Sequence, residues 1–105
     1  MANPPPFTMP DDTAIRAFCE RWMIRRLAIF GSAVRGDLRP ESDVDVFVVF
    51  EDKAPWSYWD WPAMTGQLEA MFGRKVDLVE AVAIRNPLRR RTIFAPGAHK
   101  VLYAA

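Results

Sequence analysis

The apolar run from Asp43 to Phe50 constrains the fold of this chain more than any other segment. Its alternation predicts a β-strand that carries Val44, Val46, Val48 and Phe50 on one face and Asp45, Phe47 and Val49 on the other. Beyond Asp45 both faces are apolar, and strands of that kind are covered by other elements on both sides. The sequence therefore predicts a central strand with two aspartates on the same face at its start.

Helical and strand periodicity elsewhere predicts the elements around this strand. Apolar residues recur at i, i+3, i+4, i+7 and i+8 from Ile15, which predicts a helix over about residues 12–25 with an N-cap at Asp11 or Asp12. A strand at 27–30 is predicted to end at Gly31, and a loop follows over 35–42. The next predicted elements are a helix over about 57–72, whose apolar stripe includes Trp59 and whose C-cap is Gly73, and a strand at 75–80. A short helix is predicted to start at Asn86-Pro87 and stop before Pro96, and the final segment at 100–103 is either an edge strand or a short helix. This order predicts an α/β (α+β) domain with a short mixed sheet flanked by helices.

Composition excludes several classes of function. The chain has 105 residues and a formal charge of +1, so it has the size of one domain and no charge that argues for nucleic acid or a membrane surface. The single Cys19 excludes an internal disulfide and a cysteine-built zinc site, and the single His99 excludes a histidine-rich metal site. No apolar run approaches the ~18 residues of a membrane span, and the N-terminus lacks the features of a signal peptide, so a cytoplasmic location is expected.

The chain is predicted to consist of a short proline-rich start and one domain. Residues 1–10 hold four of the nine prolines, which predicts a flexible tail that is ordered only if it docks. Residues 11–105 are predicted to form the single domain.

Two short motifs carry the residue types that phosphate chemistry requires. Gly31 removes a side chain where backbone would approach a ligand, and Ser32 adds an N–H and a hydroxyl, a combination suited to phosphate. Asp43 and Asp45 would repel each other unless a cation lies between them, and Asp77 lies in a strand with the same alternation that could stand beside Asp45. Three oxygen ligands without His or Cys favour Mg²⁺ or Mn²⁺ over zinc. The structural alternatives are a plain strand-ending turn and a strand end that faces water.

The combination of these motifs resembles a known pattern. Gly31-Ser32, Arg35-Gly36, Ser42-Asp43, Asp45 and Asp77 are similar to the arrangement GS-x-x-x-G…SD-x-D…D of the DNA polymerase beta-like nucleotidyltransferase superfamily. Within it, the chain resembles the minimal nucleotidyltransferases, or MNT proteins, from Leu27 to its end. The sequence Arg-Gly-Asp at residues 35–37 is typical of that subgroup.

The resemblance implies a small nucleotidyltransferase fold and transfer of a nucleoside monophosphate, AMP from ATP in particular, to a hydroxyl. Asp43 and Asp45 would hold two Mg²⁺ ions (or Mn²⁺), and Asp77 would complete the second site and deprotonate the acceptor. Gly31 and Ser32 would hold the β- and γ-phosphates. Arg35 would contact a phosphate, or would instead pair with Asp37 or Glu41, and Ser42 would orient Asp43 as a cap or turn residue.

The resemblance also implies a partner. MNT proteins usually act as antitoxins of helical HEPN ribonuclease toxins, and in some modules the MNT protein attaches AMP to a tyrosine of its HEPN partner, so a hetero-oligomer is expected. Two other functions stay open from the sequence. One alternative is that the chain neutralises its partner by binding and occlusion alone. The other is that it modifies RNA or a small molecule such as an aminoglycoside.

Two further clusters have open interpretations. Trp56, Trp59 and Trp61 either pack in the core or bind a partner. Arginines 85, 89, 90 and 91 form either a solvated helix face or a docking patch for an acidic partner or an RNA backbone, although no aromatic residues interleave with them to form a stacking platform. Asp37 is interpreted as a loop residue, and His99 as a surface or hydrogen-bonded histidine.

Overall fold

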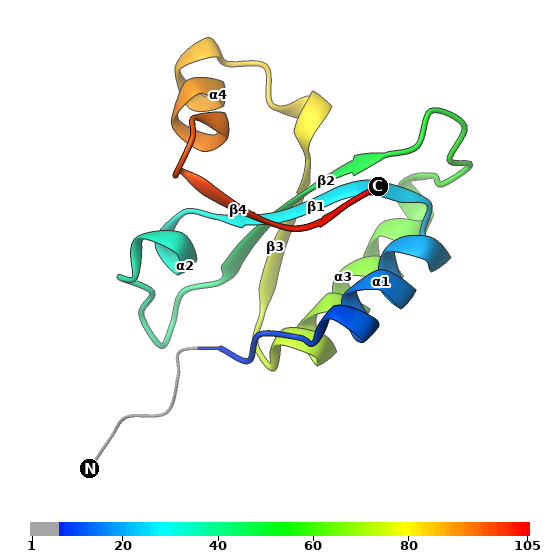
Figure 1. The fold of residues 1–105 in the computed structure, drawn as a ribbon, viewed down its shortest axis with the longest axis horizontal. Helices are drawn as coiled ribbons and strands as arrows, with labels where there is room; N and C mark the ends of the chain where they lie inside the picture. The colour runs from blue at the N-terminus through cyan, green and yellow to red at the C-terminus, as the bar shows by residue number, and fades with distance from the viewer. Residues whose placement is uncertain (1–6) are drawn as a thin grey trace.

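The computed structural model describes residues 7–105 and shows a four-stranded sheet with helices on both faces (Figure 1). In chain order the elements are α1 (Asp12–Arg21), β1 (Ile24–Phe30), α2 (Ser32–Arg35), β2 (Val44–Phe50), the 3₁₀ turn η1 (Tyr58–Asp60), α3 (Trp61–Phe72), β3 (Val76–Glu80), the 3₁₀ turn η2 (Ala81–Ala83), α4 (Pro87–Phe94) and β4 (His99–Ala104). This confirms the predicted α/β (α+β) class. None of the helices within residues 7–105 has the length and apolar character needed to cross a bilayer.

The sheet has the strand order β3-β2-β1-β4. β1 pairs antiparallel with both β2 and β4, whereas β2 pairs parallel with β3. The sheet is therefore mixed, as predicted, and β2 is an interior strand. The final segment, for which the sequence left two possibilities, is an edge strand along β1.

Both faces of β2 are covered, as its alternation predicted. α1 and α3 lie on one face of the sheet and α4 on the other (Figure 1). Val44, Val46 and Val48 are fully buried in the larger core, which includes residues of α1 and α3. Phe47 points the other way, into a smaller core that includes Ile93 of α4. Each such side chain contributes about 1.5–3 kcal/mol by leaving water, so the two cores hold β2 rigidly in place.

The first helix ends earlier than its apolar periodicity predicts. α1 stops at Arg21, because Met23 adopts a positive φ of 52° and the chain then enters β1. Ile24 pairs with Phe50 of β2, so the predicted helix over 12–25 and the predicted strand start at Leu27 were both wrong by several residues. Pairing with distant strands decides this boundary, and it overrides a local helical pattern. Trp22 is nevertheless buried, and its Nε1–H donates to Gln67 Oε1 at 2.8 Å.

The second helix starts later than predicted. Ser57 and Asp60 form a capping box in which the Asp60 carboxylate accepts from the Ser57 N–H at 2.9 Å, and this motif holds the 3₁₀ turn η1. α3 then begins at Trp61 with Pro62 in its first turn, and ends at Gly73 in the left-handed conformation, as predicted. As a consequence Trp59 is 86% exposed, so its predicted place in the apolar stripe was wrong.

The segment predicted as a loop over 35–42 is preceded by one helical turn. α2 spans Ser32–Arg35 and ends at Gly36, whose φ of 85° suits glycine. The rest of the segment is irregular, and it is fastened by Arg74, whose guanidinium donates to the carbonyls of Arg39 and Pro40. This contact holds the loop that leads directly into Asp43 and β2.

The last residues of the predicted N-terminal tail are docked on α3. The Thr8 N–H donates to the Phe72 carbonyl at 2.9 Å, the rings of Phe7 and Phe72 lie 5.9 Å apart, and Pro10 is buried. Within the predicted tail 1–10, residues 7–10 thus have defined packing, and the remainder lies outside the described residues.

Candidate active site

The parallel register of β2 and β3 places Asp45 directly opposite Asp77. Each is the second residue of its strand, so both carboxylates lie at the N-terminal edge of the β2–β3 pair. Asp43 comes immediately before β2 and is exposed, whereas Asp45 is half-buried. The three residues predicted to form the catalytic centre are therefore brought to one edge of the sheet, by a pairing that the sequence could only suggest.

The electrostatics of this edge centre on Asp45. Burial raises the pKa of the Asp45 carboxyl, and the negative charges of Asp77 and then Asp43 raise it further. Arg89 and Arg35 act in the opposite direction, but the pKa remains above its usual value. Like charges gathered on one edge destabilise the fold unless a cation is bound.

Position 31 requires glycine for two reasons, the backbone conformation there and the nearness of the Asp45 side chain. Gly31 has a φ of 70°, which lies in the region that side chains disfavour. A Cβ at this position would overlap Asp45 Oδ2 and lie 3.4 Å from Asp45 Cγ. The glycine therefore leaves room for the Asp45 carboxylate beside the turn after β1, whereas the predicted approach of this backbone to a phosphate stays a prediction.

The other residues of the predicted nucleotide site surround this turn. Ser32 is the first residue of α2, so its N–H and that of Ala33 have no carbonyl partner inside the helix. Arg35 Nε lies 3.4 Å from Asp37 Oδ2, which is the internal pair weighed for it, but both side chains are more than 60% exposed and such a pair is weak. Ser42 lies in a turn in which its N–H donates to the Arg39 carbonyl at 3.0 Å.

Arg89 is a residue near the site that sequence reasoning placed elsewhere. The sequence assigned it to a solvated helix face or a docking patch, yet its positive charge acts to lower the pKa of Asp45. The neighbouring Arg90 instead holds the fold, because its Nη1 donates to the carbonyls of Ala81 and Ile84 at 3.2 and 2.8 Å. No local pattern distinguishes these two arginines; only the packing of α4 over the sheet does.

Two other chemically capable residues have structural roles. His99 Nδ1 lies 3.0 Å from the Ile93 carbonyl, and its ring packs against Phe47, which agrees with a hydrogen-bonded histidine. Burial raises the pKa of the Cys19 thiol to about 12, so this thiol is not a nucleophile at neutral pH.

The donor set fits a hard cation that arrives with a phosphate ligand. Within residues 7–105 no group of three or more Asp, Glu, His or Cys side chains encloses a metal position by itself. Mg²⁺ is commonly held by only one or two carboxylates together with substrate phosphates. The raised pKa of Asp45 and the exposed neighbours Asp43 and Asp77 agree with carboxylates that gain a partner when such a complex binds.

The fold is that of a nucleotidyltransferase. The chain belongs to the nucleotidyltransferase domain family, whose sequence profile matches residues 12–97. Over 74 residues it is 34% identical to protein adenylyltransferase MntA from Thermococcus cleftensis, a match that covers 70% of this chain and 73% of that protein. The chain is therefore an enzyme of this family, and its relatives are of the MNT type.

Solved structures agree with this assignment. A protein described as a minimal nucleotidyltransferase superimposes with a TM-score of 0.63 and 30% identity, covering 78% of this chain and 82% of that one. A toxin–antitoxin structure with AMP-PNP superimposes with a TM-score of 0.67 over 90% of this chain and 74% of that one. The latter match has 18% identity and shows that the fold is shared.

Proposed function

We propose that this enzyme transfers AMP from ATP, bound with Mg²⁺, to a hydroxyl of a partner protein, and that it acts as the antitoxin of a HEPN-type toxin. The register that sets Asp45 opposite Asp77, with Asp43 beside them and Gly31 against the Asp45 carboxylate, is the observation that carries this proposal. The name of the MntA relative and the toxin–antitoxin structural match support the adenylyl and antitoxin parts.

The proposed chemistry assigns a role to each residue of the edge. Asp43, Asp45 and Asp77 would hold two Mg²⁺ ions, which supply positive charge to the phosphates and polarise the acceptor oxygen. Asp77 would accept the acceptor's proton as the oxygen attacks the α-phosphorus. The bond from the α-phosphorus to the bridging oxygen would break, and pyrophosphate would leave.

The turn after β1 would position the triphosphate. Gly31 brings the backbone close, and the N–H groups of Ser32 and Ala33 at the start of α2 would donate to phosphate oxygens. Arg35 would exchange its exposed partner Asp37 for a phosphate, because an exposed pair is worth little and a guanidinium pairs well with phosphate. Ser42 would hold the turn that presents Asp43.

A second candidate is neutralisation of the partner by binding alone. It is favoured by large exposed apolar side chains, since Trp59 is 86% and Leu88 is 72% exposed. In that case the aspartates would be dispensable for neutralisation.

The deciding experiment is label transfer from α-³²P-ATP with Mg²⁺ in host lysate, for the wild type and for Asp43→Asn. Asp12→Asn is the control, because Asp12 is also an exposed aspartate and lies in the first turn of α1. We expect a labelled protein band with the wild type and the control but not with Asp43→Asn. Toxin neutralisation that survives loss of both Asp43 and Asp45 would favour the binding candidate, and a labelled RNA or small molecule would contradict the protein acceptor.

A further inference from the structure

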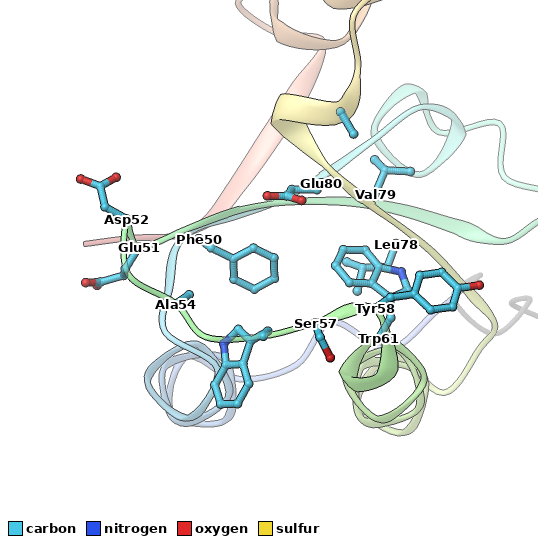
Figure 2. A pocket seen from close by; sticks show the side chains of 12 residues that line it. Phe50, Glu51, Asp52, Ala54, Ser57, Tyr58, Trp61, Leu78, Val79 and Glu80 are labelled. Atoms are coloured by element: carbon cyan, nitrogen blue, oxygen red, sulfur yellow. The ribbon is translucent and has the colours of Figure 1, made fainter.

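A second hollow lies at the opposite end of the same strands. It has a volume of about 640 Å³, and its walls include four aromatic side chains: Phe50, Trp56, Tyr58 and Trp61 (Figure 2). We call it the aromatic pocket. Phe50 ends β2, five residues beyond Asp45, which at about 3.3 Å per residue is roughly 16 Å along the strand. The aromatic pocket is therefore separate from the edge that carries the aspartates.

The walls of the aromatic pocket are held by their own contacts. The Trp61 and Phe50 rings meet edge to face with centroids 6.2 Å apart. Trp56 packs against Trp22 with centroids 4.8 Å apart, and its Nε1–H donates to the Trp22 carbonyl. A site whose walls are already in place loses little conformational freedom when it binds a ligand.

The charged residues that line the aromatic pocket are all acidic, while the guanidinium of Arg21 lies 5.8 Å from the centroid of the Trp56 ring. Glu51, Asp52 and Glu80 line it, and none of its lining residues within the described chain is Lys, Arg or His. Asp52 pairs with Arg25 at 3.5 Å, but the carboxylates of Glu51 and Glu80 make no hydrogen bond or ion pair with any part of residues 7–105. In Figure 2 Glu51 and Asp52 lie at one end of the hollow, Tyr58 and Trp61 at the other, and Glu80 above Phe50. Aromatic faces and free carboxylates together favour a cation.

The rim of the aromatic pocket exposes apolar surface as well. Tyr58 and Trp59 are 84% and 86% exposed, and their rings lie 6.0 Å apart. The capping box of Ser57 and Asp60 fixes the turn that presents them. Exposed aromatic residues of this kind are typical centres of protein–protein interfaces, so the occupant has apolar groups beside its charge.

We propose that the aromatic pocket binds an arginine side chain of a partner polypeptide, whose neighbouring apolar residues cover Tyr58 and Trp59. A guanidinium can stack on the aromatic walls and pair with the carboxylate of Glu80 at the same time. The inference rests on the proposed function in so far as that function supplies a partner protein. Binding itself requires neither ATP nor transfer.

The four tryptophans allow a direct test by NMR on the ¹⁵N-labelled chain without nucleotide. The probe is a short capped peptide with one arginine between two leucines, compared with the same peptide containing uncharged citrulline and with the small cation agmatine. We expect the Trp61 indole N–H signal to shift saturably with the arginine peptide, and the other two probes to bind about tenfold more weakly. The backbone N–H signal of Ile93, which lies in the smaller core on the other face of the sheet, should not move.

Substitution at Glu80 tests the charged part of the site. Glu80→Gln keeps the shape of the side chain and should weaken the arginine peptide about fivefold. Glu20→Gln, at an exposed position on α1, should leave its affinity unchanged. An unmoved Ile93 signal shows in both variants that the fold is intact.

Several outcomes would overturn the proposal. Equal affinity for the arginine and citrulline peptides, or an unaltered affinity in Glu80→Gln, would exclude recognition of the charge. Agmatine that binds as tightly as the peptide would make the occupant a free organic cation. Trp61 shifts that depend on protein concentration without any peptide would make it a second copy of this chain. If the protein transferred no label but still bound the arginine peptide, the proposed function would be contradicted and the binding proposal would stand.

Discussion

Asp45 and Asp77 lie opposite each other across the parallel strands β2 and β3, and the Asp45 carboxylate occupies the space that a Cβ on Gly31 would need. Two like charges at matched positions of neighbouring strands oppose folding, which supports the proposal that they hold a cation. The same strands end in an aromatic pocket with free carboxylates about it. One pair of strands thus carries the candidate catalytic edge and a candidate docking site at its two ends.

Replacing Gly31 by alanine should disable the site. The Cβ would overlap Asp45 Oδ2, and alanine at a φ of 70° is strained, so we expect about 1–3 kcal/mol of lost stability and roughly 10²-fold slower transfer. Gly66→Ala is the matched control, because Gly66 lies in α3 with open space around it and should gain about 0.5–1 kcal/mol. Urea unfolding and label transfer measure both effects, and a fully active Gly31→Ala would contradict the close approach.

Replacing Asp45 by asparagine should stabilise the metal-free fold at neutral pH. Burial, Asp77 and Asp43 raise the pKa of Asp45 in the folded state, so its ionisation lowers stability as the pH rises through that pKa. The variant lacks this charge, and we expect a gain of roughly 0.2–1 kcal/mol at pH 7 that disappears below the unfolded pKa of about 3.9. Urea unfolding in EDTA at several pH values checks this. A less stable variant at pH 7 would refute the role of the like charges.

Removing Arg89 should raise the pKa of Asp45 still further. The positive charge of Arg89 lowers that pKa in the wild type, and Arg91, an exposed arginine on the same helix, provides the control. Carboxyl ¹³C NMR titration in EDTA should therefore show a higher Asp45 pKa in Arg89→Ala and an unchanged one in Arg91→Ala. Identical titrations of the two variants would place Arg89 outside the site.

The N-cap of α4 should contribute measurably to stability. The Asn86 side-chain oxygen accepts from the N–H groups of Leu88 and Arg89 at 2.9 and 3.1 Å. Asn86→Ala should cost about 1 kcal/mol, and Asn86→Asp should cost little, because aspartate caps equally well and suits the positive end of the helix dipole. Thermal unfolding of both variants provides the comparison. If both lost the same stability, the contribution of Asn86 would not come from its N-cap hydrogen bonds.

Several features could be predicted because they depend on short-range geometry. The alternation of residues 43–50 defines two faces at a period of two, whatever lies on them, and the structure buries Val46 on one and Phe47 on the other. The positive φ angles of Gly31 and Gly73 depend only on the turns in which they lie. The same holds for the N-cap that Asn86 and Pro87 form at the start of α4. The resemblance carried by the aspartates then indicated the family.

Other features depended on residues far apart in the chain. The helical pattern that continues through Met23 ends at Arg21, because Ile24 gains hydrogen bonds to β2 that local propensity cannot register. Trp59 is exposed whereas the nearby Trp56 and Trp61 are partly buried. Arg89 acts on the charge of Asp45, whereas the adjacent Arg90 donates to a backbone carbonyl.

The sequence by itself determined which residues are candidates for the chemistry, because the spacing of Asp43 and Asp45 and the glycine of the turn act locally. Only the tertiary structure decided that Asp77 stands opposite Asp45, that α4 brings Arg89 within electrostatic reach, and that β2 and β3 end in an aromatic pocket. These relations follow from strand register and packing, which depend on the free energy of the whole core and not on any one segment.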